Sequence, residues 1–222
     1  MRFVVAVDGP GGVGKTTVSR AVAEALGCAH LDTGSFYRAA TAVAMLHRLD
    51  PTNEAEVMRV IAGVTLDYSD GRMLVEGIDM SEALRTQAVT AEVSRLSTLP
   101  GVRMLLVRRQ REWLASRGGR AVVEGRDIGT VVFPAASLKV FLTARAEVRA
   151  ARRAAQASIE VVTVRENLAR RDHLDSTRRA SPLKPADDAI VMDTSDIAVT
   201  SVVDAVLRRA AERGIGPPGA DR

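Results

Sequence analysis

The chain has 222 residues, of which 46% are hydrophobic and 26% are charged, and its formal net charge is +4. This length and balance predict one well-buried globular domain. No apolar stretch approaches the ~18 residues of a membrane-spanning helix, and the apolar run at residues 3–7 is too short for a secretion signal. The single cysteine, Cys28, cannot form an internal disulfide, so we expect a cytoplasmic protein.

Five apolar segments predict the strands of one buried parallel sheet, namely residues 3–8, 28–32, 121–125, 139–143 and 189–193. All but the second are nearly continuous rather than alternating, as expected of strands that are covered on both faces. Helical patterns lie between these strands, at residues 14–26, 145–156, 160–172 and 199–212. Gly27 is placed to end the first helix. Strands that alternate with helices predict an α/β fold with right-handed crossovers.

One segment breaks this alternation. Between residues 64 and 80, two alternating runs flank Ser69-Asp70-Gly71, which is a signal for a β-hairpin. We expect this hairpin to belong to a small insert in the main domain. Residues 214–222, with the sequence GIGPPGADR, are expected to form a disordered tail.

The segment Gly9-Pro10-Gly11-Gly12-Val13-Gly14-Lys15-Thr16 fits the pattern G-x-x-x-x-G-K-[ST] and joins the first strand to the first helix. Glycines let backbone N–H groups converge on phosphate oxygens, and the N-terminus of the helix adds its positive dipole. Lys15 would reach the β- and γ-phosphates, and the Thr16 hydroxyl would bind Mg²⁺. The alternative is a chance glycine-rich turn, but the place of the motif between a strand and a helix favours nucleotide binding.

This motif alone does not define a reaction. Outside the loop itself, the chain lacks the Asp-x-x-Gly and Asn-Lys-x-Asp motifs of switch GTPases. It also lacks the Leu-Ser-Gly-Gly-like signature of ABC-type ATPases and the Asp-Glu pair expected of helicase-like motors. Instead, arginines follow the predicted strand ends, which indicates a second anionic substrate.

Two of these strand ends carry candidate site residues. The second strand leads into Asp32-Thr33-Gly34-Ser35-Phe36-Tyr37-Arg38, and ligands in doubly wound sheets gather beyond the carboxyl ends of the strands. Arg38 is therefore a candidate ligand residue, and the alternative is a solvated helix arginine. After the third strand, Arg126 could bind phosphate and Asp127 could accept from the exocyclic amine of a base. The alternative is a structural ion pair between the two.

The carboxyl-terminal third contains a further candidate group. Arg171, Asp175 and Arg178 are spaced four and three apart, so on a helix they share one face. The two arginines could bridge the phosphates of donor and acceptor, and Asp175 could accept from a ribose hydroxyl. The alternative is a salt-bridged helix face. The same choice between ligand binding and a solvated helix surface applies to Arg145, Arg149, Arg152 and Arg153.

These motifs together resemble the bacterial type of cytidylate kinase, a nucleoside monophosphate kinase. The resemblance runs from about residue 3 to residue 210 and is carried by DGPGGVGKTT, LDTGSFYR, the hairpin insert followed by SRLSTLPGVRMLLVRRQREW, EGRDIGTVVFP, KVFLTA and RRDHLDSTRRASPLKPADDAIVMDTS. The hairpin insert distinguishes this type from adenylate and uridylate kinases. Two features depart from the family pattern: the stretch between Arg153 and Arg171 is shorter and lacks glycine, and His173-Leu174 replaces a more polar pair.

The resemblance implies the P-loop nucleoside-kinase fold, an α/β fold with a five-stranded parallel sheet and helices on both faces. One kinase domain would span residues 1–222. Its core would comprise residues 1–32, 106–148 and 172–212. The hairpin-containing insert, at about 33–105, would bind the nucleoside monophosphate, and a short helical lid would cover about 149–171.

The resemblance also implies roles for individual residues. ATP binding falls to the phosphate loop and the lid, that is, to Gly9, Pro10, Gly11, Gly12, Val13, Gly14, Lys15, Thr16, Thr17, Arg149 and Arg153. CMP binding falls to Thr33, Arg38, Ser94, Arg103, Arg126, Asp127, Arg171, Asp175 and Arg178. In this second set, the residues that read the cytosine would be Ser94, Arg103 and Asp127. Those that hold the acceptor phosphate would be Arg38, Arg126 and Arg178. Catalysis would depend on Lys15, Arg126, Arg171 and Arg178.

The implied reaction is ATP-dependent phosphorylation of CMP and dCMP, with Mg²⁺ held mostly by phosphates and water and in part by Thr16. We expect a cytoplasmic monomer that binds neither nucleic acid nor a membrane. The acceptor phosphate is already anionic, so no general base is needed, and we interpret His30, His47, His173 and Cys28 as structural.

Two alternatives remain open. One is another P-loop small-molecule or nucleoside monophosphate kinase, acting on UMP or AMP for example. The other is a nucleotide-regulated binding module or a nucleic-acid-associated ATPase, against which the modest net charge and the 3% aromatic content argue.

Overall fold

The computed structural model describes residues 2–157, 161–178 and 180–218. The chain divides into two compact units. The first comprises Met1–His30 and Gly119–Arg222, and the second comprises Leu31–Gly118. Among the residues described, no helix is both long and apolar enough to span a membrane.

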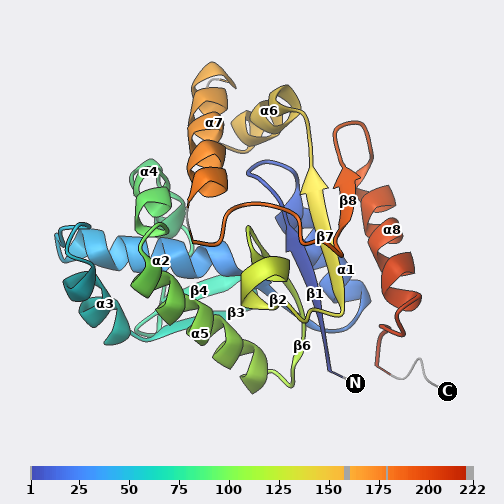
Figure 1. Ribbon diagram of the computed structural model, residues 1–222, viewed down its shortest axis with the longest axis horizontal. Helices are drawn as coiled ribbons and strands as arrows, with labels where there is room; N and C mark the ends of the chain where they lie inside the picture. The colour runs from blue at the N-terminus through green and yellow to red at the C-terminus, as the bar shows by residue number, and fades with distance from the viewer. Residues whose placement is uncertain (1, 158–160, 179, 219–222) are drawn as a thin grey trace. The chain divides into compact units, whose positions relative to one another are not determined.

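The first unit is built on a five-stranded sheet whose strand order is β2-β6-β1-β7-β8 (Figure 1). Its strands are β1 (Phe3–Asp8), β2 (Ala29–Asp32), β6 (Arg120–Gly125), β7 (Leu138–Thr143) and β8 (Ile190–Asp193). β1 runs parallel to both β6 and β7, and β7 runs parallel to β8. The predicted α/β fold with a five-stranded parallel sheet is thus confirmed, with each strand within one residue of its predicted bounds.

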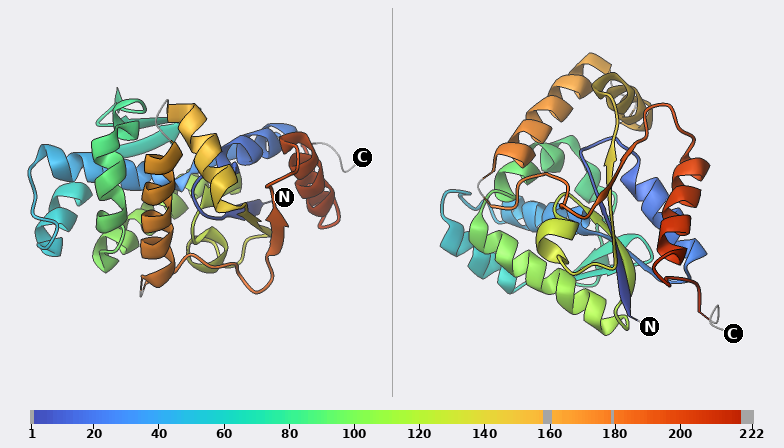
Figure 2. Two further views of the ribbon diagram at one scale, coloured as in Figure 1. Left: turned by 90° about the horizontal axis from the view of Figure 1, so that it is seen from above. Right: turned by 45° about the vertical axis from the view of Figure 1, so that its right-hand side comes forward.

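The core of this unit lies between the sheet and two helices, α1 (Lys15–Ala25) and α8 (Val199–Ala211). These helices lie side by side, as Figure 2 shows. Val18 and Val22 of α1 and Val202 and Val206 of α8 are buried against the strand side chains. Burial of each such side chain contributes roughly 1.5–3 kcal/mol. The amphipathic patterns in the sequence reflect this one apolar stripe on each helix.

The described residues at the carboxyl-terminal end are more ordered than the sequence predicted. Disorder was predicted to begin at residue 214, but Ile215 is buried in the core, and its backbone N–H donates to the Ala210 carbonyl at 2.9 Å. Burial of the isoleucine side chain offsets the entropy lost when this segment is ordered. The prediction is therefore wrong at this position, and residues 219–222 lie outside the described part of the chain.

Two further helices complete the first unit, α6 (Ala146–Ala157) and α7 (Val161–Thr177), and they pack against each other (Figure 2). Both were predicted, but α7 was expected to end at residue 172. It continues for another turn, and Arg178, just beyond its end, still donates its N–H to the Leu174 carbonyl at 3.2 Å. Arg171 and Asp175 therefore lie on one helix. Residues 158–160 of the predicted lid lie outside the described residues.

The second unit contains a small antiparallel sheet and helices around it. Its helices are α2 (Thr33–Leu46), α3 (Glu54–Ala62), α4 (Gln87–Leu96) and α5 (Pro100–Ser116), with a short 3-10 turn at Ala83–Arg85. The sheet consists of β3 (Leu66–Ser69), β4 (Arg72–Val75) and β5 (Ile78–Asp79). The predicted hairpin is confirmed as β3–β4, with positive φ angles of 51° at Asp70 and 78° at Gly71. The third strand, β5, was not predicted.

Trp113 of α5 anchors that helix within the second unit. Its indole N–H donates to the Tyr68 carbonyl at 2.6 Å, and the two rings meet edge to face at 6.3 Å. α5 also packs along α3. α5 is one continuous helix and lies wholly within the second unit, which ends at Gly118. The insert boundary at about 105 stays a prediction.

Candidate active site

The phosphate loop links β1 to α1 and requires glycine at two close approaches. At Gly9, where φ is +146°, an added Cβ would lie 2.2 Å from the Leu142 carbonyl oxygen. At Gly12, where φ is +81°, it would lie 2.9 Å from the Arg149 carbonyl oxygen. Side chains other than hydrogen are therefore excluded at both positions. The loop ends at the N-terminus of α1, where free N–H groups and the helix dipole favour an anion.

Lys15, the first residue of α1, is buried beside this loop. Its ammonium group donates to the carbonyl oxygens of Gly9 at 2.9 Å and Pro10 at 2.7 Å. Burial, and secondarily the positive charge of Arg126, lowers the pKa of Lys15 to about 7. A bound phosphate would favour the charged form and raise this pKa again, so the site is electrostatically suited to an anion.

A buried carboxylate links Thr16 to a histidine. The Thr16 hydroxyl donates to Glu124 Oε2 at 3.0 Å, and His30 Nε2 lies 3.1 Å from Glu124 Oε1. The sequence placed Glu124 at a strand end but gave it no role, and His30 was interpreted as structural. The sequence signal for Glu124 was its place near the carboxyl end of a strand, where ligands gather, whereas His30 lies inside β2.

The donor set at Thr16 fits Mg²⁺, which prefers hydroxyl, carboxylate and phosphate oxygens and keeps several waters. Within the described ranges, no group of three or more His, Cys, Asp or Glu side chains could hold a metal ion. A magnesium ion at this loop would therefore need phosphate oxygens as well as the Thr16 hydroxyl, with Glu124 orienting that hydroxyl.

Three arginines surround the buried Asp175 carboxylate. Arg126 Nε lies 3.1 Å and Arg171 Nε 3.9 Å from Asp175 Oδ2, and Arg178 Nη1 lies 3.5 Å from Oδ1. The shared face predicted for Arg171 and Asp175 is confirmed, whereas Arg178 follows the helix instead of lying on it. Asp175, together with Asp127 at 3.9 Å from Arg178, offers two negative charges to three guanidinium groups, so these residues keep a net positive charge. Such an excess favours a doubly charged phosphate.

Asp127 adjoins this cluster from the end of β6. Its carboxylate is buried, and its Oδ1 lies 3.9 Å from Nη2 of Arg178. Arg126, the residue before Asp127, forms its ion pair with Asp175, which is 49 positions away in the sequence. Asp127 immediately precedes a π-helical turn, η2 (Ile128–Val132).

The lid arginines differ in their partners. Arg149 donates to the Gly11 carbonyl of the phosphate loop at 3.1 Å and forms an ion pair with Asp172, whose Oδ1 also accepts from the Gly11 N–H at 3.4 Å. Arg152 instead donates to the hydroxyl and carbonyl of Thr194, at 3.1 and 2.7 Å. Of these two side chains, Arg149 is the one that contacts the phosphate loop.

Two further arginines lie on the surface: Arg145, which directly precedes α6, and Arg153, which lies on it. Arg145 forms an exposed two-point pair with Asp196, at 2.6 and 2.8 Å. Arg153 is exposed on α6. The ATP-binding role that the resemblance implies for Arg153 stays a prediction.

The second unit holds the other predicted acceptor residues. Arg38 pairs with Asp32 at 2.5 Å and is therefore not a freely solvated arginine. Arg103 is buried, donates to the Ser97 carbonyl at 3.3 Å and lies 5.4 Å from the centroid of the Tyr37 ring, which is within cation–π range. Thr33 and Ser94 are also buried.

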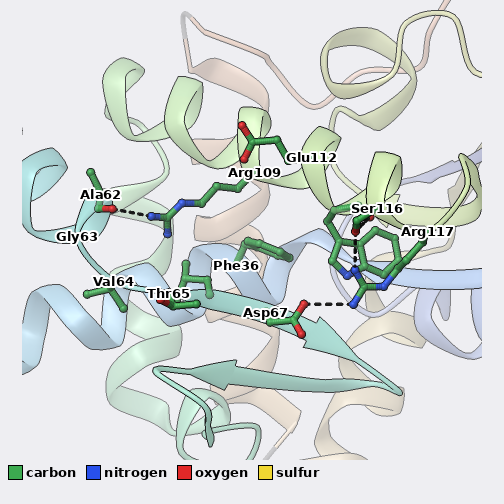
Figure 3. A pocket seen from close by; sticks show the side chains of 12 residues that line it. Phe36, Ala62, Gly63, Val64, Thr65, Asp67, Arg109, Glu112, Ser116 and Arg117 are labelled. Atoms are coloured by element: carbon green, nitrogen blue, oxygen red, sulfur yellow. Dashed lines mark hydrogen bonds and ion pairs between the residues drawn. The ribbon is translucent and has the colours of Figure 1, made fainter.

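The second unit also contains a pocket of about 440 Å³ between α5 and the segment 62–67 (Figure 3). Arg109 donates to the Ile61 and Ala62 carbonyls at the end of α3, and Arg117 pairs with Asp67 at 3.2 Å. The polar groups on its walls thus stabilise the unit itself. None of its described lining residues belongs to the sets predicted to bind ATP or CMP.

The family model described as "Cytidylate kinase" matches residues 5–212. The chain belongs to the cytidylate kinase family. Among curated cytidylate kinases, the Rhodococcus jostii protein is 46% identical, with 96% of each chain covered. The Mycolicibacterium paratuberculosis protein is 49% identical over 90% of this chain and 92% of its own.

The family assignment confirms the resemblance drawn from the motifs. Among solved structures, a Thermus thermophilus protein shares the fold, with a TM-score of 0.51 and 17% identity over 94% of this chain and 97% of its own. This likeness concerns the fold alone. The residues matched by the family model include the phosphate loop and every residue of the Asp175 cluster. Both anion sites therefore lie in the region that this chain shares with the cytidylate kinase family.

Proposed function

We propose that this protein transfers the γ-phosphoryl group of ATP to CMP or dCMP and releases ADP and CDP or dCDP. The observation that carries the proposal is the pairing of two anion sites in one unit. The phosphate loop around Lys15 provides one, and the arginines around Asp175 provide the other. The positive charges of Arg126 and Arg171 act on the pKa of Lys15, as expected of neighbouring sites. The curated relatives bear the name of this activity.

On the donor side, backbone N–H groups of Gly11–Lys15 would hold the β- and γ-phosphates. Lys15 would exchange its two carbonyl partners for phosphate oxygens, which gain more from a positive charge than a neutral carbonyl does. Mg²⁺, bound by the phosphates with the Thr16 hydroxyl, would supply further neutralisation of the developing charge. Arg149 would contribute from the lid, because it already contacts Gly11.

On the acceptor side, the nucleophile is an oxygen of the CMP phosphate. It is already ionised near neutral pH, so the site has no proton to remove and catalysis consists of positioning and neutralisation. Arg126 and Arg178 would hold this phosphate together with Arg38, and Arg171 would act between the two substrates. Asp175 fixes the arginines and would accept from a ribose hydroxyl.

The base would be read by Ser94, Arg103 and Asp127. Cytosine carries an exocyclic amine, which donates, beside ring and carbonyl acceptors. A buried carboxylate such as Asp127 can accept from this amine, whereas the corresponding carbonyl of uracil would face it with like polarity. This difference is the proposed origin of the preference for CMP over UMP.

A substrate panel tests the proposal. Purified protein with ATP and Mg²⁺ is incubated with CMP, dCMP, UMP or AMP, and ADP release is measured. We expect turnover with CMP and dCMP, and a value of kcat/KM for UMP lower by about tenfold or more. Turnover that depends on UMP or AMP alone would instead identify another nucleoside monophosphate kinase.

The same assay addresses the remaining alternative. A nucleic-acid-associated ATPase would release ADP when DNA or RNA is added, with steep salt dependence and no need for a monophosphate. Monomeric state and cytoplasmic location stay predictions, and light scattering on the purified protein measures the first of them.

A further inference from the structure

Asp8, the last residue of β1, holds a segment that follows a different strand. Its Oδ1 accepts from the backbone N–H of Ile128 and its Oδ2 from that of Gly129, both at 2.8 Å. The two bonds are buried and span 120 and 121 positions of the chain. A single side chain thus fixes the entry into the π-helical turn η2.

This contact determines where the preceding residues can lie. β1 and β6 pair in parallel, with Asp8 beside Gly125, so the chain leaves the sheet at a fixed point. Three positions later, Ile128 is held by Asp8 and is itself fully buried. Arg126 and Asp127 are therefore the only two residues between two fixed backbone positions.

The carboxylate is costly at this position. Burial raises the pKa of Asp8 to about 6, and the negative charge of Asp127 adds to this effect. A shorter or neutral side chain would avoid that cost. However, only a carboxylate offers two acceptor oxygens to two N–H groups, because the amide of asparagine would point a donor at one of them.

Gly129, whose N–H donates to Asp8, has little room for a side chain. An added Cβ there would lie 3.1 Å from Lys139 Cδ, so that side chain would have to shift, and 3.4 Å from Asp8 Oδ2, which is ordinary contact distance. The phosphate-loop motif begins at Gly9, so it does not explain Asp8, the first residue of DGPGGVGKTT. It does not explain Gly129, the last residue of EGRDIG, either.

We propose that Asp8 is a positioning residue for the acceptor site: it sets the backbone at Ile128 and Gly129 and thereby places Arg126 and Asp127 for phosphate and base. The inference rests on the proposed function, because it assumes that these two residues meet CMP. Since Asp8 directly precedes Gly9, whose carbonyl accepts from Lys15, the same residue connects the donor loop to the acceptor residues.

The test compares Asp8→Asn with the wild-type protein in steady-state kinetics. We expect KM for CMP to rise by about tenfold, with the CMP preference over UMP reduced, while KM for ATP changes by less than about twofold. Asp50→Asn is the matched control, because Asp50 also accepts from a backbone N–H, that of Thr52 at 2.8 Å, but lies exposed in the second unit. An unchanged KM for CMP, or an equal rise in KM for ATP, would overturn the proposal.

A measurement that does not depend on activity and a second variant complete the test. Amide hydrogen exchange should become faster in a peptide covering 126–132 of Asp8→Asn, and unchanged exchange there would contradict the proposal. If Asp8→Asn does not fold, Asp8→Glu replaces it: it keeps both acceptor oxygens on a longer side chain, so it should displace the Ile128 and Gly129 N–H groups and give the same kinetic pattern. If the wild-type protein does not phosphorylate CMP, the proposed function fails, while the exchange measurement still decides whether Asp8 holds the segment.

Discussion

Arg126 Nε lies 3.1 Å from Asp175 Oδ2, although the two residues are 49 positions apart in the sequence. Arg126 follows β6 and Asp175 lies on α7, so this contact ties a sheet end to the last turn of that helix. It also makes Asp175 the common partner of Arg126, Arg171 and Arg178.

Removal of the shared carboxylate should destabilise the protein. Asp175→Asn leaves three neighbouring guanidinium groups without their common counter-charge, and loss of one partner of a buried pair costs about 3 kcal/mol. Urea unfolding measures this change, and added sulfate should recover part of it by binding the arginines. Glu212→Gln is the control, because its exposed pair with Arg209 is worth at most about 1 kcal/mol. Equal effects of the two substitutions would contradict this role for Asp175.

Loss of the loop lysine should remove most of the activity. Lys15→Ala should lower kcat/KM by about a hundredfold or more, equivalent to ~3 kcal/mol of transition-state stabilisation. Lys184→Ala serves as the control, since Lys184 is exposed and should leave the rates unchanged. Near-normal turnover of Lys15→Ala would disprove the assignment of the donor site.

Substitution of the proposed base reader should change selectivity. Asp127→Asn replaces one acceptor oxygen by a donor, so the ratio of kcat/KM for CMP to that for UMP should fall by roughly tenfold. Competition between the two nucleotides in one reaction measures this ratio directly. If the ratio stays at its wild-type value, Asp127 does not read the base.

Arg149 and Arg152, three positions apart on α6, should separate nucleotide binding from stability. Arg149 contacts the phosphate loop through Gly11, so Arg149→Ala should raise KM for ATP by about tenfold. Arg152 binds Thr194, so Arg152→Ala should lower Tm by a few degrees and leave KM for ATP near its wild-type value. The reverse pattern would assign the lid contact to Arg152.

Burial of Asp8 should give stability a pH dependence of known sign. The pKa of Asp8 is raised from 3.8 to about 6 in the folded protein, chiefly by burial, so the folded state binds this proton more tightly than the unfolded chain does. Relative to Asp8→Asn, the free energy of unfolding of the wild type should therefore fall as pH rises from about 4 to about 6 and stay level above. Urea titrations of both proteins across this range measure the difference. A difference that is independent of pH would mean that Asp8 keeps its ordinary pKa.

The sequence contained most of the information about the fold. Strand positions followed from apolar runs, and the hairpin followed from Ser69-Asp70-Gly71, because an apolar run and a turn signal can both be read from consecutive residues. The end of α7 and the order at Ile215 were predicted wrongly. Both depend on contacts that the local pattern does not contain, such as the burial of Ile215 in the core.

The sequence by itself also determined the phosphate loop, because all the residues of that motif are contiguous and their geometry is set by glycine and by the start of one helix. Only the tertiary structure decided how Glu124 meets Thr16, how Asp8 meets Ile128 and how Arg126 meets Asp175. The pairing of β1 with β6 places Val7 beside Glu124 and Asp8 beside Gly125. A register between distant strands brings such side chains together, and no local pattern in the sequence specifies that register.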